Sequence, residues 1–106
     1  MSAAVLVVVA CTYSEMTLPE HLPSGAIIIK QDELSFSPRS VTVRAGEVLY
    51  FWNGESAIHN LVFGSQDRSP DMKASDVFER RFLEPGEYEV TCDYHPQMRL
   101  QVSVVE

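Results

Sequence analysis

From Gly25 onward, short runs rich in hydrophobic side chains alternate with turn-forming residues. Eight of these runs have the length and composition of β-strands: residues 26–30, 33–37, 40–44, 47–53, 57–63, 77–83, 86–93 and 99–105. Between them stand residues that favour a preset or positive φ, namely Pro38, Gly46, Gly54, Gly64 and Pro85. The polar residues 65–75 are predicted to form a loop, and no run has the period of an amphipathic helix. This pattern predicts an all-β sandwich of about eight short strands.

The period-2 alternation of strands also indicates which side chains face the interior. In the run 86–93, Cys92 falls on the same side as Tyr88 and Val90, and the glutamates fall on the other side. In the run 57–63, His59 shares its side with three apolar residues, Ala57, Leu61 and Phe63. A cysteine and a histidine are therefore predicted to point into the core, where a charged imidazolium would be costly.

Composition and charge narrow the class of protein. The chain has 106 residues, too few for two ordinary domains. Its 45% hydrophobic and 22% charged residues make it too apolar to be disordered. The net charge is −7, and no run of basic residues interrupts the acidity, so nucleic acid is excluded as a partner. Two cysteines do not make a disulfide scaffold, and three histidines limit any metal site to a small one.

The start of the chain differs from its body. Residues 3–10 are an uncharged apolar run, too short to span a bilayer, which needs about 20 residues. The run has the length of a signal-peptide apolar region, and residues 8–11 resemble a bacterial lipobox, in which the cysteine carries lipid. The opening residues lack the positive charge of a signal, however, and a buried first strand is the alternative.

We therefore interpret residues 1–24 as a signal or lipobox-like segment followed by a tether, and residues 25–106 as the folded domain. Under this interpretation the protein is exported, and it is either periplasmic or anchored to the outer face of the membrane through Cys11. A disulfide between Cys11 and Cys92 is a less favoured alternative, because Cys92 is a candidate metal ligand.

The candidate chemistry is concentrated in one segment, Cys92-Asp93-Tyr94-His95-Pro96-Gln97-Met98. It follows an inward-facing strand and brings a cysteine, a histidine and a methionine into one short loop. A thiolate, two imidazoles and a weak, distant thioether are the ligand set of a mononuclear electron-transfer copper site. The buried His59 is available as the second histidine, because its competitor His21 lies in the presumed tether.

Other interpretations of these residues are open. Taken singly, a buried cysteine is usually a small hydrophobic residue, and a buried histidine or methionine is usually part of the packing. A zinc site would need a fourth strong ligand, which Asp93 could supply. A nucleophilic pair of Cys92 and His95 would need an orienting group and an oxyanion hole, and neither is evident in the sequence.

Residues 25–106 resemble the cupredoxins. Their short ligand loop is most similar to that of the amicyanins, with plastocyanins and pseudoazurins, whose loops are longer, as relatives. The resemblance is carried by residues 25–29, 36–38, 45–47, 58–63, 84–88 and 92–99. It implies a cupredoxin-like Greek-key sandwich that holds one type 1 copper ion per chain.

The resemblance also implies roles for individual residues. Four of them would be copper ligands, three strong and one weak and axial, namely His59, Cys92, His95 and Met98. Asn60 resembles the residue that hydrogen-bonds the thiolate and joins the two ligand segments. Tyr94 stands where relatives usually have proline, and its backbone N–H is an additional donor that could reach the Cys92 sulfur and raise the reduction potential. Gln97 replaces an apolar residue of some relatives, so the surface around His95 is expected to be more polar.

The function implied is that of a one-electron carrier, not an enzyme, with His95 near solvent as the electron port. Its partners would be redox proteins, such as a c-type cytochrome, a dehydrogenase or an oxidase, and a monomer is expected. The acidic net charge favours partners with a basic docking surface, although it equally serves solubility. The alternatives are a copper carriage or delivery protein and a metal-free sandwich for adhesion or assembly.

Overall fold

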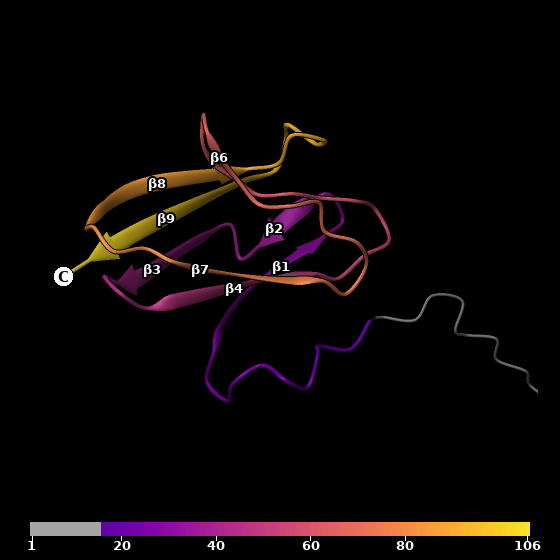
Figure 1. Cartoon of the computed structure of the whole chain (residues 1–106), viewed down its shortest axis with the longest axis horizontal. Helices are drawn as coiled ribbons and strands as arrows, with labels where there is room; N and C mark the ends of the chain where they lie inside the picture. The colour runs from indigo at the N-terminus through magenta and orange to yellow at the C-terminus, as the bar shows by residue number, and fades with distance from the viewer. Residues whose placement is uncertain (1–15) are drawn as a thin grey trace, which may run out of the picture.

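Two β-sheets pack face to face in the computed structural model, which describes residues 16–106 (Figure 1). One sheet has the strand order β2-β1-β4-β7, and the other has the order β3-β9-β8-β5-β6. The strands are β1 (Ile27–Asp32), β2 (Ser35–Ser37), β3 (Ser40–Arg44), β4 (Val48–Asn53), β5 (Val62–Gly64), β6 (Asp67–Arg68), β7 (Val77–Arg81), β8 (Gly86–Thr91) and β9 (Arg99–Val105). No helix occurs among the described residues, and the predicted all-β sandwich is confirmed.

Both sheets mix parallel and antiparallel pairs. β1 pairs with β4 and β3 pairs with β9 in parallel, whereas the other neighbours are antiparallel. Parallel neighbours cannot be joined by a tight hairpin, so the chain crosses between the layers, passing from β2 in one sheet to β3 in the other and back to β4. These crossovers bring the loops that follow β4 and β8 to the same end of the sandwich.

The predicted runs and the observed strands differ in two places. Each of the eight runs contains a strand, but in the run 57–63 only the end is one, because β5 begins at Val62. The preceding His59 instead forms an isolated bridge with Met72. Within residues 65–75, predicted to be a loop, lies the two-residue strand β6. Both of its residues are charged, so it has no apolar pattern by which it could be recognised.

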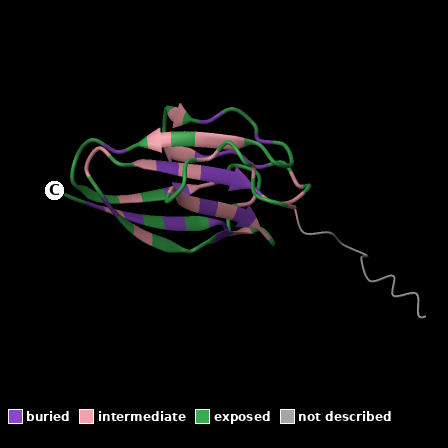
Figure 2. Cartoon of the chain, turned by 90° about the horizontal axis from the view of Figure 1, so that it is seen from below, coloured by how far each residue is buried: buried purple, intermediate pink, exposed green. Residues whose placement is uncertain are grey.

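The core lies between the sheets and follows the period of the strands (Figure 2). In β9, Leu100, Val102 and Val104 are buried, whereas the residues between them are more exposed. The predicted inward orientation of Cys92 and His59 is confirmed, with 3% and 0% of their surfaces exposed. Each fully buried Leu or Val side chain contributes about 1.5–3 kcal/mol to folding. The burial of these side chains therefore stabilises the framework around Cys92 and His59.

Residues 16–26 precede β1 without forming a strand. Cys11 and the lipobox-like residues lie outside the described part of the chain, so the lipid anchor stays a prediction. Within residues 16–106, no helix is long and apolar enough to cross a membrane.

Gln31 is a buried side chain at the end of β1 and yields a stability prediction. It is 0% exposed, and neither its amide oxygen nor its amide nitrogen has a hydrogen-bond partner among the described residues. An unpaired buried polar group costs about 1–3 kcal/mol, so Gln31→Met, which nearly conserves the shape, is expected to raise the free energy of unfolding by about 1 kcal/mol. Urea denaturation of the metal-free proteins measures the difference. A destabilised variant would indicate that the amide is paired, for example with a buried water.

Candidate metal centre

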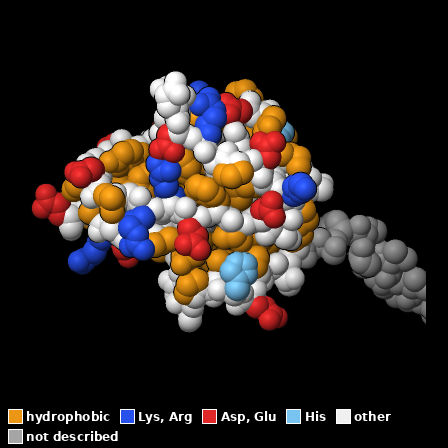
Figure 3. Space-filling view, viewed as in Figure 1, with side chains coloured by type: hydrophobic (Ala, Val, Ile, Leu, Met, Phe, Trp, Pro, Cys, Tyr) orange, Lys and Arg blue, Asp and Glu red, His pale blue; other side chains and the backbone are white. Residues whose placement is uncertain are grey.

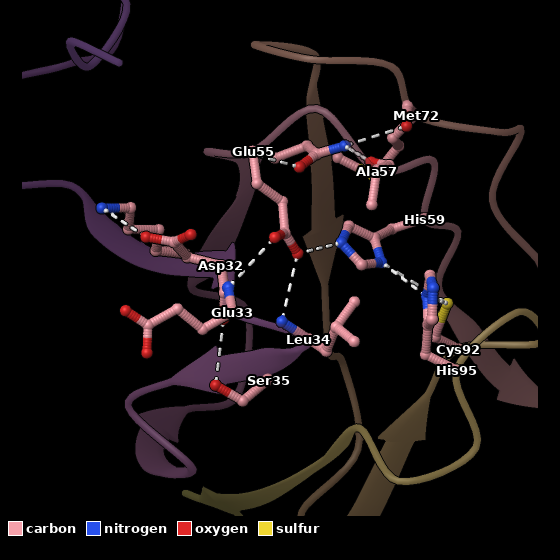
Figure 4. Close-up of polar contacts among 12 residues, drawn as sticks. Asp32, Glu33, Leu34, Ser35, Glu55, Ala57, His59, Met72, Cys92 and His95 are labelled. Atoms are coloured by element: carbon pink, nitrogen blue, oxygen red, sulfur yellow. Dashed lines mark hydrogen bonds and ion pairs between the residues drawn. The ribbon is translucent and has the colours of Figure 1, made fainter. Parts of the chain in front are cut away.

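Three side chains with metal-ligating atoms converge at one end of the sandwich (Figure 4). The ligand atoms of His59, Cys92 and His95 all lie within 4.8 Å of one another. The Cys92 Sγ atom is 3.8 Å from Nδ1 of each histidine, and the two Nδ1 atoms are 3.2 Å apart. His59 and Cys92 are buried, whereas His95 is half-buried. The cluster is therefore enclosed on the side of the core and reaches the surface through His95.

Cys92 and His95 lie on the loop between β8 and β9. Because β8 ends at Thr91, its alternation directs the next side chain, that of Cys92, into the sandwich. The Met98 amide donates a hydrogen bond of 2.9 Å to the His95 carbonyl, which closes a tight turn before β9 begins. Met98 itself is 0% exposed and belongs to the hydrophobic core.

His59 lies on the segment between β4 and β5, and two loops hold it. Its backbone N–H and carbonyl both pair with Met72, at 3.1 and 2.6 Å. Asn53, at the end of β4, donates through Nδ2 to the carbonyls of Ala57 and Met72 at 2.8 and 3.0 Å. The histidine is thus fixed by loop-to-loop hydrogen bonds and not by a continuous strand.

The Glu55 carboxylate orients the His59 ring (Figure 4). Glu55 Oε2 lies 2.6 Å from His59 Nε2, and because a carboxylate only accepts, the imidazole N–H is the donor. The same carboxylate accepts the backbone N–H groups of Glu33 and Leu34, at 3.1 and 3.2 Å. These two residues form the β1–β2 turn with φ of 53° and 54°, a conformation that is unusual outside glycine. With the proton on Nε2, the lone pair of Nδ1 faces the cluster.

Asp93 and Asn60 join the two segments that carry the cluster. The Asp93 N–H donates to Asn60 Oδ1 at 2.9 Å, and Asn60 Nδ2 donates to Asp93 Oδ2 at 2.8 Å. Arg68 also donates to this carboxylate. The Arg68 guanidinium, and after it the Asn60 amide, hold the pKa of Asp93 below its ordinary value. Asn60 thus joins the two segments through Asp93. No hydrogen bond from Asn60 to the Cys92 Sγ atom is found among the described residues, so its expected bond to the thiolate stays a prediction.

Comparison with known families agrees with this geometry. The family model of the cupredoxin-like domain matches residues 3–104 of the chain. The chain belongs to the cupredoxin-like family. Amicyanin of Paracoccus versutus is 32% identical over 89 residues, which cover 78% of this chain and 67% of that protein. Plastocyanin of Ulva prolifera is 30% identical over 84 residues, 67% of this chain and 85% of its own.

The solved structures lead to the same family. The crystal structure of amicyanin from Paracoccus versutus aligns with this cupredoxin at a TM-score of 0.74 and 30% sequence identity, over 79% of this chain and 85% of that one. The resemblance to the cupredoxins, and to amicyanin in particular, is therefore confirmed. Cupredoxins bind copper, and the family's proteins generally serve in electron transfer.

The donor atoms of this cupredoxin fit a type 1 copper site. Two imidazole nitrogens and a thiolate are the strong ligands of such a site. Donors that share one ion through bonds of about 2.0–2.3 Å lie about 3–4 Å apart, in agreement with the spacings of 3.2 and 3.8 Å here. The spacing of the three donors therefore fits a single bound ion.

The rival interpretations of the sequence fit less well. Asp93 is absent from the cluster of metal-ligating groups found among residues 16–106, because its carboxylate is engaged by Arg68 and Asn60. Within this described part of the chain, a zinc site would therefore lack a fourth strong ligand. His21 is exposed and also lies outside the cluster.

Sequence reasoning missed two residues that hold the site, Glu55 and Arg68. Glu55 stands four residues before a buried histidine, a spacing that would have justified considering it as the partner of the imidazole. Arg68 lies in a polar stretch with no motif. Its partner Asp93, on the loop that carries Cys92 and His95, is 25 residues away in the sequence. Only the folded chain reveals it.

Tyr94 yields a prediction about the reduction potential. The residue is 51% exposed, and its phenol O–H donates a hydrogen bond of 2.8 Å to the Asp71 carboxylate. No hydrogen bond from its amide to the Cys92 Sγ atom is found among the described residues, so the effect expected of that amide stays a prediction. Tyr94→Pro removes the amide donor and is expected to lower the potential, because electron density returns to the sulfur and favours Cu(II). Voltammetry measures the shift.

Tyr94→Ala is the matched control, since it loses the phenol and keeps the amide. A Tyr94→Pro protein whose potential equals or exceeds that of Tyr94→Ala would contradict the argument.

Proposed function

We propose that this cupredoxin carries single electrons between redox proteins and is not an enzyme. The observation that carries the proposal is the convergence of three strong donors within 4.8 Å at one end of the sandwich, where His95 is half-buried. The ligands would be His59, Cys92 and His95, with Met98 as the weak axial one. Copper held in this set supplies the Cu(II)/Cu(I) couple.

The protein's own residues would keep the site in one geometry during the exchange. His59 is fixed by Glu55 and by the bridge to Met72, and Cys92 is fixed at the end of β8. Little movement of the ligands between oxidation states means a low barrier to electron transfer. The buried His59 closes the inner side, so an electron would pass through the half-buried ring of His95.

Exposed apolar side chains next to the cluster support docking at this end. Of the six exposed large hydrophobic residues found among residues 16–106, three adjoin the site: Leu34 at 37%, Ile58 at 39% and Tyr94 at 51% exposed. Ile58 precedes His59 and Tyr94 precedes His95, while the Leu34 amide shares Glu55 with His59. Apolar surface around the port allows close approach of a partner and exclusion of water.

The distribution of surface charge bears on how a partner would approach. The net charge is −7, yet acidic and basic side chains are interspersed over the face in Figure 3. The acidity is therefore not gathered into one steering patch on that face. The amicyanin and plastocyanin relatives are exported electron carriers, which supports redox proteins as partners. A c-type cytochrome, dehydrogenase or oxidase as partner, the periplasm, the anchor at Cys11 and a monomeric state are parts of this proposal.

Adding Cu(II) to the metal-free protein tests the function. We expect an intense visible charge-transfer band from the copper–thiolate bond, the paramagnetic-resonance spectrum of a type 1 site, and reversible voltammetry with fast electron self-exchange. Easy loss of Cu(I) to a chelator, with slow self-exchange, would favour copper delivery. Failure to bind copper would favour a metal-free module.

A further inference from the structure

The short strand β6 connects two parts of the molecule through its side chains. Asp67 forms an ion pair with Arg80 of β7, and Arg68 forms one with Asp93 on the loop that carries Cys92 and His95. In the described part of the chain β6 pairs only with β5, and it has two residues, so its backbone contributes little to the sheet. Each of its two side chains therefore adds a contact with another part of the fold.

Arg68 holds Asp93 with a directed pair of hydrogen bonds. Its Nε donates to Asp93 Oδ2 at 2.7 Å and its Nη2 to Oδ1 at 3.2 Å. The third nitrogen, Nη1, donates to the Ser65 carbonyl at 2.8 Å, which fixes the guanidinium itself. A planar guanidinium that meets a carboxylate through two bonds sets its direction as well as its distance, which a lysine does not do.

The other contacts of Asp93 extend this connection to both ligand segments. Asp93 directly follows Cys92, and Asn60, which bonds both its carboxylate and its amide, directly follows His59. The carboxylate is thus held from two sides, by Arg68 and by Asn60. The loop residues around it, including Tyr94, Pro96 and Gln97, are exposed and provide little packing of their own.

We propose that Arg68 is a positioning residue of the metal centre: through Asp93 it holds the Cys92–His95 loop against the His59 segment and keeps the three donor atoms together. The nature of the metal rests on the proposed function, but the positioning itself is a property of the folded chain. Arg68 also offsets the negative charge of Asp93 beside the thiolate, and this charge would otherwise favour Cu(II) over Cu(I).

Both side chains of the ion pair are partly exposed, at 43% and 41%. Such pairs contribute little to global stability, at most about 1 kcal/mol. Arg68 is therefore expected to act on the loop and on the metal more than on the melting temperature. This difference separates positioning from a merely structural role.

The test compares Arg68→Gln and Arg68→Lys with a matched control, Arg80→Gln. The control also removes an Arg–Asp pair of β6, together with the contact of the Arg80 guanidinium with the Phe63 ring. Arg80 lies on β7, which carries none of the cluster residues. Three quantities are measured: release of Cu(I) to a chelator, the reduction potential, and hydrogen exchange of the Asp93 amide in the metal-free protein.

The upper value for an exposed ion pair, about 1 kcal/mol, corresponds to a ratio of about five. For Arg68→Gln we therefore expect about fivefold faster Cu(I) release. We also expect a lower reduction potential and faster hydrogen exchange of the Asp93 amide. Arg68→Lys keeps the positive charge but not the pair of directed hydrogen bonds, so it should retain the wild-type potential but release Cu(I) faster. High salt should speed release from the wild type and leave Arg68→Gln nearly unchanged. Arg80→Gln should keep the wild-type potential, and any increase in its Cu(I) release or Asp93 exchange should be clearly smaller than in Arg68→Gln.

Equal release and exchange in Arg68→Gln and the wild type would overturn the proposal, as would the same increase in Arg80→Gln, which would mean general loosening. If Arg68→Lys released Cu(I) at the wild-type rate, the role of the two directed hydrogen bonds would be refuted. A wild-type protein that takes up no copper would refute the proposed function, while the Asp93 exchange rate would still test Arg68.

Discussion

Cys92→Ser is expected to abolish the intense visible charge-transfer band of the copper-loaded protein. That band requires a short, covalent copper–thiolate bond, and serine offers a hydroxyl whose oxygen is neither soft nor ionised at neutral pH. The Cys92 Sγ atom lies 3.8 Å from Nδ1 of both His59 and His95. Absorption and paramagnetic-resonance spectra, recorded after equal amounts of Cu(II) are added to variant and wild type, measure the loss.

The control must separate loss of the ligand from loss of the fold. Cys92 is buried, so a hydroxyl there is partly unsatisfied and costs about 1–3 kcal/mol. Cys92→Ala avoids that polar group, and circular dichroism establishes that each variant is folded. Met98→Leu, which removes only the weak ligand, should keep a thiolate band with an altered energy. A folded Cys92→Ser protein that stayed blue would eliminate Cys92 as the ligand.

How far the sequence predicted this site differs between its residues. The inward position of Cys92 followed from the alternation of a real strand, β8, and was predicted for the right reason. The burial of His59 was also predicted correctly, but from a run that is not a strand at that point. Its position comes from the bridge to Met72, 13 residues further on, which alternation does not describe.

The remaining contacts of the site depend on pairs that are distant in the sequence. Glu55 accepts amides 21 and 22 residues before it, and Arg68 reaches a carboxylate 25 residues after it. A hydrophobic pattern reports which face of an element is buried, but it does not report which polar groups meet once two loops are brought together. The fold class and the inward positions of Cys92 and His59 were thus readable from local pattern, whereas the contacts of Glu55 and Arg68 were not.

Glu55→Ala is expected to weaken copper binding by about 10–100-fold, the range typical for loss of a group that orients a metal-ligating histidine. The variant leaves the His59 Nε2–H without its acceptor and frees the ring to rotate or to place the proton on Nδ1, where it would block the metal. It also leaves the Glu33 and Leu34 amides unpaired in a turn with left-handed φ, so the β1–β2 turn should loosen. Competition with a chelator of known affinity measures the binding, and nitrogen NMR of the imidazole measures the tautomer in the metal-free protein.

Two further variants separate the roles of this carboxylate. Glu47→Ala is the matched control, because Glu47 also accepts a backbone N–H in a turn, that of Arg44, without contacting the cluster. It should leave copper affinity and tautomer unchanged. Glu55→Gln keeps an acceptor oxygen but loses the charge, so the Nε2–H tautomer should largely persist while the reduction potential rises, since a negative charge near the metal favours Cu(II). If Glu55→Ala kept both wild-type affinity and the Nε2–H tautomer, the sandwich and the bridge to Met72 alone would orient His59, and Glu55 would serve only the β1–β2 turn.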